Sequence, residues 1–181
     1  YLCSTDGLSF SDKGWNYVYF RVTYESGNVV TYNTEERHKK WFKVVSLTQI
    51  TNTSAITDRS DYVIRNNDTK GYIYDNGNSI ALSSTITYNP LFFFNFENTG
   101  SGYKIKNKST GDYVRRNYTS LNISETDPDD ATTFSLTPKN GDLFTIHDGT
   151  SYWGLQRANS SEVSIRNNYR DWIIYKVDYS G

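Results

Sequence analysis

Apolar and polar residues alternate in short runs along most of the chain. Over residues 103–106, tyrosine and isoleucine alternate with two lysines, which is the two-residue period of a strand with one buried face. The polar residues 107–112 follow, and Gly111 among them is suited to a turn that needs positive φ. An apolar pair at 113–114 then begins a returning strand. The pattern predicts a strand, a tight turn and a second strand.

The same pattern occurs three times at a constant spacing. Tyr62, Tyr103 and Phe144 each begin an apolar-x-Ile-x-(Asn/Asp) run, and both offsets equal 41 residues (103 − 62 and 144 − 103). A fixed period of this kind indicates a repeat architecture. Each unit also ends in an apolar strand and has room for about four short strands. The sequence therefore predicts an all-β fold, a β-trefoil with three repeats of about 41 residues, near 61–98, 102–138 and 143–178.

The first part of the chain fits this period less well. Stretches rich in apolar and β-branched residues at 17–24, 29–32 and 41–45 predict three strands. We interpret residues 1–56 as an N-terminal β-strand extension or a degenerate repeat, and residues 57–181 as the trefoil. A four-bladed β-propeller is the alternative if the first group counts as a blade, but that group is too short to equal the others.

Composition supports an all-β chain and argues against two classes of partner. Tyrosine, a strand former, accounts for 16 of the 181 residues, and methionine is absent. The net charge is −1, from 19 basic and 20 acidic side chains, so no nucleic-acid partner is expected. Apolar runs such as residues 91–94 are far too short to span a bilayer, so no membrane insertion is expected.

The sequence contains no motif typical of an enzyme or a metal site. Cys3 is the single cysteine, which leaves no internal disulfide, and His38 and His147 lack the spacing of zinc ligands. Phosphate-binding and nucleophile-elbow motifs are absent as well. We therefore expect a protein without catalytic residues, metal or cofactor.

The repeated run, followed by a Gly-x-Tyr turn and a late apolar strand, resembles the ricin-B-type (R-type lectin) β-trefoil. The resemblance covers roughly residues 57–178. The family closes its units with Gln-x-Trp, and the best match here is Arg170-Asp171-Trp172, which keeps the tryptophan and lacks the glutamine. The units that end near Phe96 and Leu136 lack the tryptophan too. Because Trp172 precedes an apolar strand, we predict that it belongs to the core.

The resemblance implies a non-catalytic carbohydrate-binding module of a larger secreted or cell-surface protein. In such lectins an early Asp, an aromatic platform and a nearby Asn or Gln hold a sugar. The ring stacks on the sugar's C–H face, while the polar groups bind its hydroxyls. The residues that match by position are Asp148, Tyr152, Trp153 and Gln156 in the third unit, Tyr74, Asp75 and Asn76 in the first, and Asp112 and Tyr113 in the second.

We expect the binding site in the third unit, near Asp148 and Trp153. Strand alternation places Tyr152 and Trp153 on opposite faces, so that one is buried and the other exposed. A protein-binding trefoil, such as a protease inhibitor or an accessory docking domain, is the alternative to a glycan binder, and the sequence leaves a purely structural spacer and the oligomeric state open. It also leaves open whether six Asn-x-Ser/Thr triplets carry glycans, at Asn52, Asn67, Asn107, Asn117, Asn122 and Asn159.

Overall fold

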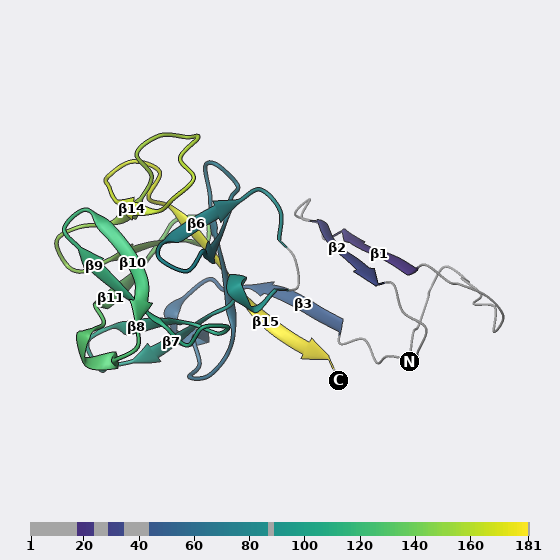
Figure 1. The fold of residues 1–181 in the computed structure, drawn as a ribbon, viewed down its shortest axis with the longest axis horizontal. Coiled ribbons are helices and arrows are strands. Elements are labelled where there is room, and N and C mark those ends of the chain that lie inside the picture. Colours follow the sequence, from purple (N-terminus) through teal and green to yellow (C-terminus); the bar gives the residue numbers. More distant parts are fainter. Residues whose placement is uncertain (1–17, 24–28, 35–43, 87–88, 181) are drawn as a thin grey trace.

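The computed structural model describes residues 18–23, 29–34, 44–86 and 89–180 (Figure 1). Within these ranges the regular structure consists of β-strands and short 3-10 helices, and no α-helix occurs. The prediction of an all-β chain is confirmed. Cys3, His38 and Trp41 lie outside the described residues.

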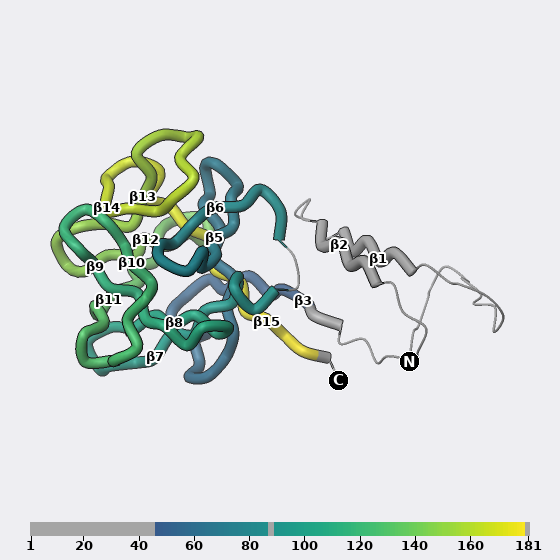
Figure 2. Tube along the Cα trace, in the orientation of Figure 1, coloured from purple at the N-terminus to yellow at the C-terminus, as the bar shows by residue number. Residues whose placement is uncertain are grey.

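Four strands lie within each predicted unit, and Figure 2 shows their course in successive colours along the chain. The first unit holds β4 (Tyr62–Asn66), β5 (Tyr72–Asp75), β6 (Ile80–Ser83) and β7 (Phe94–Asn98). The second holds β8 (Tyr103–Asn107), β9 (Tyr113–Asn117), β10 (Ser120–Glu125) and β11 (Thr133–Lys139). The third holds β12 (Leu143–His147), β13 (Trp153–Gly154), β14 (Ser164–Ile165) and β15 (Trp172–Ser180). Three 3-10 helices connect strands: η1 (Thr53–Ala55), η2 (Pro90–Phe92) and η3 (Pro128–Asp130).

Six of these strands form a closed barrel. The antiparallel pairs run β4–β7, β7–β8, β8–β11, β11–β12, β12–β15 and β15–β4, which returns to the starting strand. The other six form the hairpins β5–β6, β9–β10 and β13–β14. These hairpins also pair with one another, through β10 and β14 and through the bridges Ser79–Asn122 and Ala81–Glu162. Closure leaves none of the six barrel strands as a free edge.

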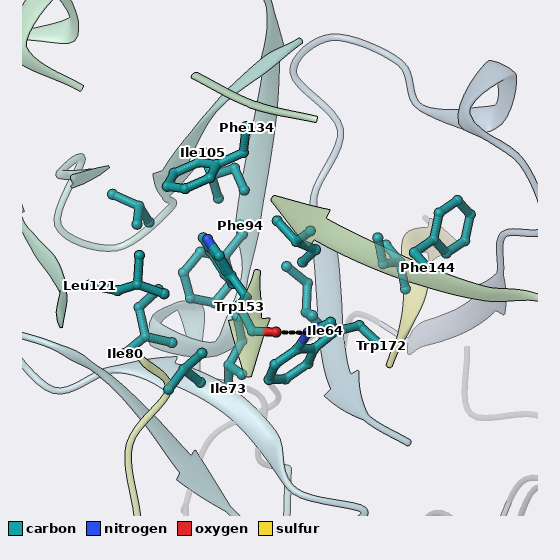
Figure 3. Packing of buried hydrophobic residues seen from close by; sticks show 14 of the residues in the cluster. Ile64, Ile73, Ile80, Phe94, Ile105, Leu121, Phe134, Phe144, Trp153 and Trp172 are labelled. Atoms are coloured by element: carbon teal, nitrogen blue, oxygen red, sulfur yellow. Dashed lines mark hydrogen bonds between the residues drawn. The ribbon is translucent and has the colours of Figure 1, made fainter. Parts of the chain in front are cut away.

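Alternate residues of the barrel strands point inward and form the main core. Its largest fully buried side chains are Trp153, Trp172, Tyr62, Phe94, Phe96, Phe134 and Phe144. Figure 3 shows this packing and the one hydrogen bond drawn within it, from Trp172 Nε1 to the Trp153 carbonyl oxygen at 3.1 Å. The prediction that Trp172 belongs to the core is confirmed.

The intervening residues of β4 and β15 pack into a second apolar cluster on the opposite face. It includes Val63, Ile173 and Tyr175, together with Phe92 and Phe93 from the segment around η2. The apolar run at residues 91–94 has the composition of a strand, but its first three residues precede β7. Asn89 Oδ1 accepts a hydrogen bond from the Leu91 N–H, and Pro90 favours the first turn of a helix, so a 3-10 turn precedes β7.

The Asn or Asp that closes each repeated run organises the turn that follows. Asn66 Oδ1 accepts hydrogen bonds from backbone N–H groups two and three residues ahead, as do Asn107 Oδ1 and Asp148 Oδ1. This is an Asx-type turn, and it explains why the position is Asn or Asp in all three copies. Asn107 is fully buried and its Nδ2 donates to the Leu91 carbonyl, so it does not serve as a glycan acceptor.

Strands from the predicted extension occur in two places. β1 (Val18–Thr23) and β2 (Val29–Thr34) form a two-stranded antiparallel sheet. β3 (Val44–Gln49) pairs with the second half of β15, from Gln49 opposite Tyr175 to Val44 opposite Ser180. β15 therefore pairs with β12, β4 and β3 along its length.

Candidate functional site

The predicted residues of the third unit lie in different environments. Trp153 is fully buried, and its ring meets the Phe134 ring edge-on with centroids 5.1 Å apart. A ring in this position cannot stack on a ligand at the surface, so Trp153 as a sugar platform is a wrong prediction. Tyr152 is half-exposed and Gln156 is exposed. Strand alternation holds as expected, with Tyr152 as the accessible ring of the pair.

Asp75 and Tyr113 are also structural rather than available to a ligand. Asp75 is 1% exposed, and its carboxylate accepts hydrogen bonds from the Gly77 N–H (2.7 Å) and from Thr110 Oγ1 (2.8 Å). It thereby joins a hairpin turn of the first unit to the first turn of the second. Tyr113 is 6% exposed and donates its hydroxyl to Glu97 Oε2 at 2.8 Å. Both predictions of sugar contact are corrected, because burial and these bonds occupy the groups.

The remaining predicted residues of the first and second units are half-buried or committed to turns. Tyr74 is half-buried and stacks on Phe92, with ring centroids 5.1 Å apart. Asn76 is exposed, but its Oδ1 accepts the N–H groups of Asn78 and Ser79. Asp112 is half-buried, and its backbone carbonyl accepts the Asn107 N–H.

A tyrosine faces a basic residue across the first turn of every unit. The opposed pairs are Arg65 and Tyr72, Lys106 and Tyr113, and His147 and Tyr152. In the first two, the cation lies over the ring, 5.4 and 4.9 Å from its centroid; in the third, the two ring centroids are 5.4 Å apart. The sequence carries a signal for this that motif reasoning missed, since a basic residue precedes the turn's Asn or Asp in all three copies.

Two side chains, His147 and Arg170, lie against the half-exposed ring of Tyr152, and Thr137 is hydrogen-bonded to His147. We call these four residues the Tyr152 site. The Arg170 guanidinium lies over the Tyr152 ring, 4.5 Å from its centroid. His147 Nδ1 accepts the Gly149 N–H, so the neutral imidazole carries its proton on Nε2 and donates it to Thr137 Oγ1 at 2.8 Å. All four side chains reach solvent at least in part. The site combines one aromatic ring with a hydroxyl, an imidazole and a guanidinium.

The Asp148 carboxylate is occupied by an ion pair within the protein and is not available to a ligand. Its Oδ1 holds the turn, and its Oδ2 accepts Arg116 Nη1, which also reaches Thr150 Oγ1 at 3.2 Å. Burial alone would raise the pKa of Asp148, but hydrogen bonds from Arg116, Thr150 and Ser151 together lower it from 3.8 to about 2. At neutral pH the carboxylate is charged and fully engaged, which corrects its predicted role as a sugar ligand.

Sequence reasoning missed Tyr118, whose ring is 88% exposed at the tip of the β9–β10 hairpin. Asn117 pairs with Ser120, so Tyr118 and Thr119 make a two-residue loop. Tyr118 has φ 53, a left-handed conformation that is unusual for an aromatic residue. The Arg116 Nε donates to its carbonyl at 2.9 Å and supports this shape. The sequence signal that could have located Tyr118 is a two-residue hairpin loop that contains no glycine, so that a large side chain projects from its tip.

The described residues contain no group of three or more His, Cys, Asp or Glu side chains placed to hold a metal ion. In the same part of the chain, no helix has the length and apolar character needed to cross a membrane.

No protein-family model matches the chain, and no curated protein matches it. Among solved structures it is similar to a ricin B-like lectin from Macrolepiota procera in complex with lactose, with 16% identity and a TM-score of 0.57 over 66% of this chain and 96% of that one. It is also similar to a GlcNAcα1-4Gal-releasing endo-β-galactosidase from Clostridium perfringens (16% identity, TM-score 0.58), over 66% of this chain and 33% of that chain.

A third similar structure is lysenin in complex with phosphocholine, with 14% identity and a TM-score of 0.50 over 84% of this chain and 56% of that chain. At such low identities, these likenesses establish the fold and leave function to be argued from the site. The closed barrel, the three mutually paired hairpins and these neighbours show that the chain has the β-trefoil fold of the ricin B-like lectins.

Proposed function

We propose that this chain is a non-catalytic carbohydrate-binding module whose ligand contacts the Tyr152 site. The observation that carries the proposal is the exposure of Tyr152, since its counterparts Tyr72 and Tyr113 are buried. An accessible tyrosine edge or face contacts the C–H groups of a pyranose. Arg170 over this ring, and Thr137 next to His147, offer hydrogen bonds to the hydroxyls of a sugar. The same fold in a lectin that binds lactose supports this function.

We further propose that the module is part of a larger secreted or cell-surface protein. The endo-β-galactosidase supports this, because the region similar to this chain is about a third of that protein's chain. Proteomics of the extracellular and surface fractions of the source cells tests the location. Recovery of its peptides mainly from the intracellular fraction would contradict it.

Replacing Tyr152 with alanine is expected to weaken glycan binding by about 2- to 10-fold, because aromatic contacts contribute about 0.5–1.5 kcal/mol beyond area burial. A glycan array identifies a ligand, and isothermal titration measures its affinity. Tyr72→Phe is the matched control, since it alters the buried counterpart and removes a hydroxyl without a hydrogen-bond partner in the described structure. Failure of the folded protein to bind any glycan would refute the proposed function.

A second candidate function is recognition of phosphocholine headgroups at a membrane surface. The likeness to lysenin spans 84% of the chain, which is more than the 125 residues of 57–181 provide, so it extends into the first 56 residues. The exposed ring of Tyr118, at the tip of the β9–β10 hairpin, suits a water–lipid interface. Co-sedimentation with phosphatidylcholine vesicles separates this candidate from glycan binding.

The substitution Tyr118→Gly tests the second candidate with little effect on stability. Glycine adopts positive φ without strain but loses more backbone entropy on folding, so we expect the free energy of unfolding to change by less than about 1 kcal/mol. Urea denaturation checks this value. If Y118G sediments with phosphatidylcholine vesicles as well as the parent protein does, Tyr118 is not a membrane contact.

A further inference from the structure

We propose that the Tyr152 site selects acidic sugars, with the Arg170 guanidinium binding the carboxylate of a sialic or uronic acid residue. This inference rests on the proposed carbohydrate-binding function and names its ligand class. Arg170 belongs to the short segment before β15, in the place where the resembled lectin motif has glutamine. Arg170 therefore places a positive charge over the Tyr152 ring at a position where that motif has a neutral amide.

The geometry of Arg170 suits a planar anion. Its guanidinium lies against the Tyr152 ring, with 4.5 Å between Cζ and the ring centroid. A guanidinium held on an aromatic ring loses little further freedom when it binds, and its fork of N–H groups matches the two oxygens of a carboxylate. The ring that supports the guanidinium also presents apolar surface at the same site. A carboxylate-bearing sugar satisfies both groups at once.

The carboxylates around the site are already paired with other cations. Asp171, next to Arg170 in the chain, accepts Lys139 Nζ at 2.6 Å, and Asp148 accepts Arg116. Within the described part of the chain, Arg170 has no carboxylate within ion-pair distance. Its positive charge is therefore available to an external anion. The half-buried position keeps the guanidinium partly out of water, which strengthens a pairing with a ligand charge.

The other two units serve as internal comparisons. In them the tyrosine opposite the basic residue is buried, and the basic side chain is bonded within the protein. Lys106 lies 3.9 Å from Glu97, which also accepts the hydroxyl of Tyr113. Arg65 donates Nε to the Lys70 carbonyl, and the ring beneath it, Tyr72, is 3% exposed. Those cations are held by the protein, and those rings are covered. In the third unit the ring is half-exposed, and Arg170 places a guanidinium over it in addition to the neighbouring His147 ring.

The test compares lactose with sialyllactose, which differ by one carboxylate-bearing sugar. We expect the parent protein to bind sialyllactose at least 10-fold more tightly, and Arg170→Gln to remove that preference, a loss of about 10- to 100-fold in sialyllactose affinity. Arg170→Lys keeps the charge but loses the planar fork, so an intermediate affinity is expected. Arg65→Gln is the matched control and should leave both affinities unchanged.

The possible outcomes distinguish failure of the acidic-sugar inference from failure of the proposed carbohydrate-binding function. Equal binding of lactose and sialyllactose, unaffected by R170Q, overturns the acidic-sugar inference and leaves carbohydrate binding in place. Binding of neither sugar, nor of any other glycan, by the folded protein overturns the proposed function as well. Tighter binding of a sulfated lactose than of sialyllactose overturns the carboxylate assignment. If R170Q does not fold, competition by free N-acetylneuraminic acid against the parent protein decides, since no competition contradicts the inference.

Discussion

Replacing Trp172 with alanine is expected to lower the free energy of unfolding by about 3–5 kcal/mol. The side chain is fully buried at the start of β15, where that strand joins β12 and β4. Its removal leaves a cavity in the barrel and deprives the Trp153 carbonyl of the Trp172 Nε1 hydrogen bond. Urea denaturation followed by circular dichroism measures the change.

Trp153→Phe provides a graded comparison for this prediction. Trp153 Nε1 is buried and has no hydrogen-bond partner in the described structure, so its loss removes no bond. The carbonyl that accepts the bond from Trp172 is backbone and persists in W153F. We expect W153F to cost about 1–2 kcal/mol, through lost volume alone. If the free energy of unfolding of W172A lies within about 1 kcal/mol of the parent's, Trp172 does not contribute to core stability as proposed.

Asp148→Asn is expected to lower stability at neutral pH by about 2 kcal/mol, and this difference should vanish in acid. The folded-state pKa of Asp148 is lowered from 3.8 to about 2, and its side chain is 11% exposed. A lowered pKa stabilises the folded protein above pH 3.8, and this contribution is lost as the pH falls through about 2. Asparagine keeps the Oδ1 turn bonds, as Asn66 and Asn107 do, but it gives up the charge that Arg116 binds.

Urea unfolding at several pH values checks this sign. The gap in unfolding free energy between the parent and D148N should be constant from pH 7 to about pH 5 and shrink steadily between pH 4 and pH 2. Arg115→Gln is the matched control. Arg115 forms an exposed pair with Glu125 at 3.1 Å, so its loss should cost less than about 1 kcal/mol. A gap that stays the same at pH 2 would show that Asp148 acts through shape rather than charge.

The sequence predicted the fold better than it predicted the site. Strand alternation and the turn chemistry of Asn66 and Asn107 are local properties, so they appear in the chain order and located most of the strands. β10 was not located as a separate strand, because Leu121 and Ile123 are its only large apolar residues among polar ones. The 3-10 turn at η2 was missed because its apolar residues looked like the strand that follows.

Site residues depended on contacts that chain order does not reveal. The pairing of Asp148 with Arg116 joins residues 32 positions apart, and the stacking of Arg170 on Tyr152 joins residues 18 positions apart (170 − 152). Strand alternation predicts that Tyr152 and Trp153 lie on opposite faces, but it does not tell which of the two is buried. Trp153 took the inward face opposite Phe134. The proposed site lies where one copy departs from the others, because Tyr152 is half-exposed while Tyr72 and Tyr113 are buried.

The position of β15 has a consequence for how this protein is made. Residues Trp172–Lys176 fill the gap between β4 and β12, more than a hundred residues after β4 begins. During synthesis, the ring of strands therefore stays open until these residues have left the ribosome. Long-range pairing of this kind is slow to form because the intervening chain must first be brought together. Until those residues emerge, the nascent chain exposes the apolar interior of β4 and β8, so closure is a late step in forming the barrel.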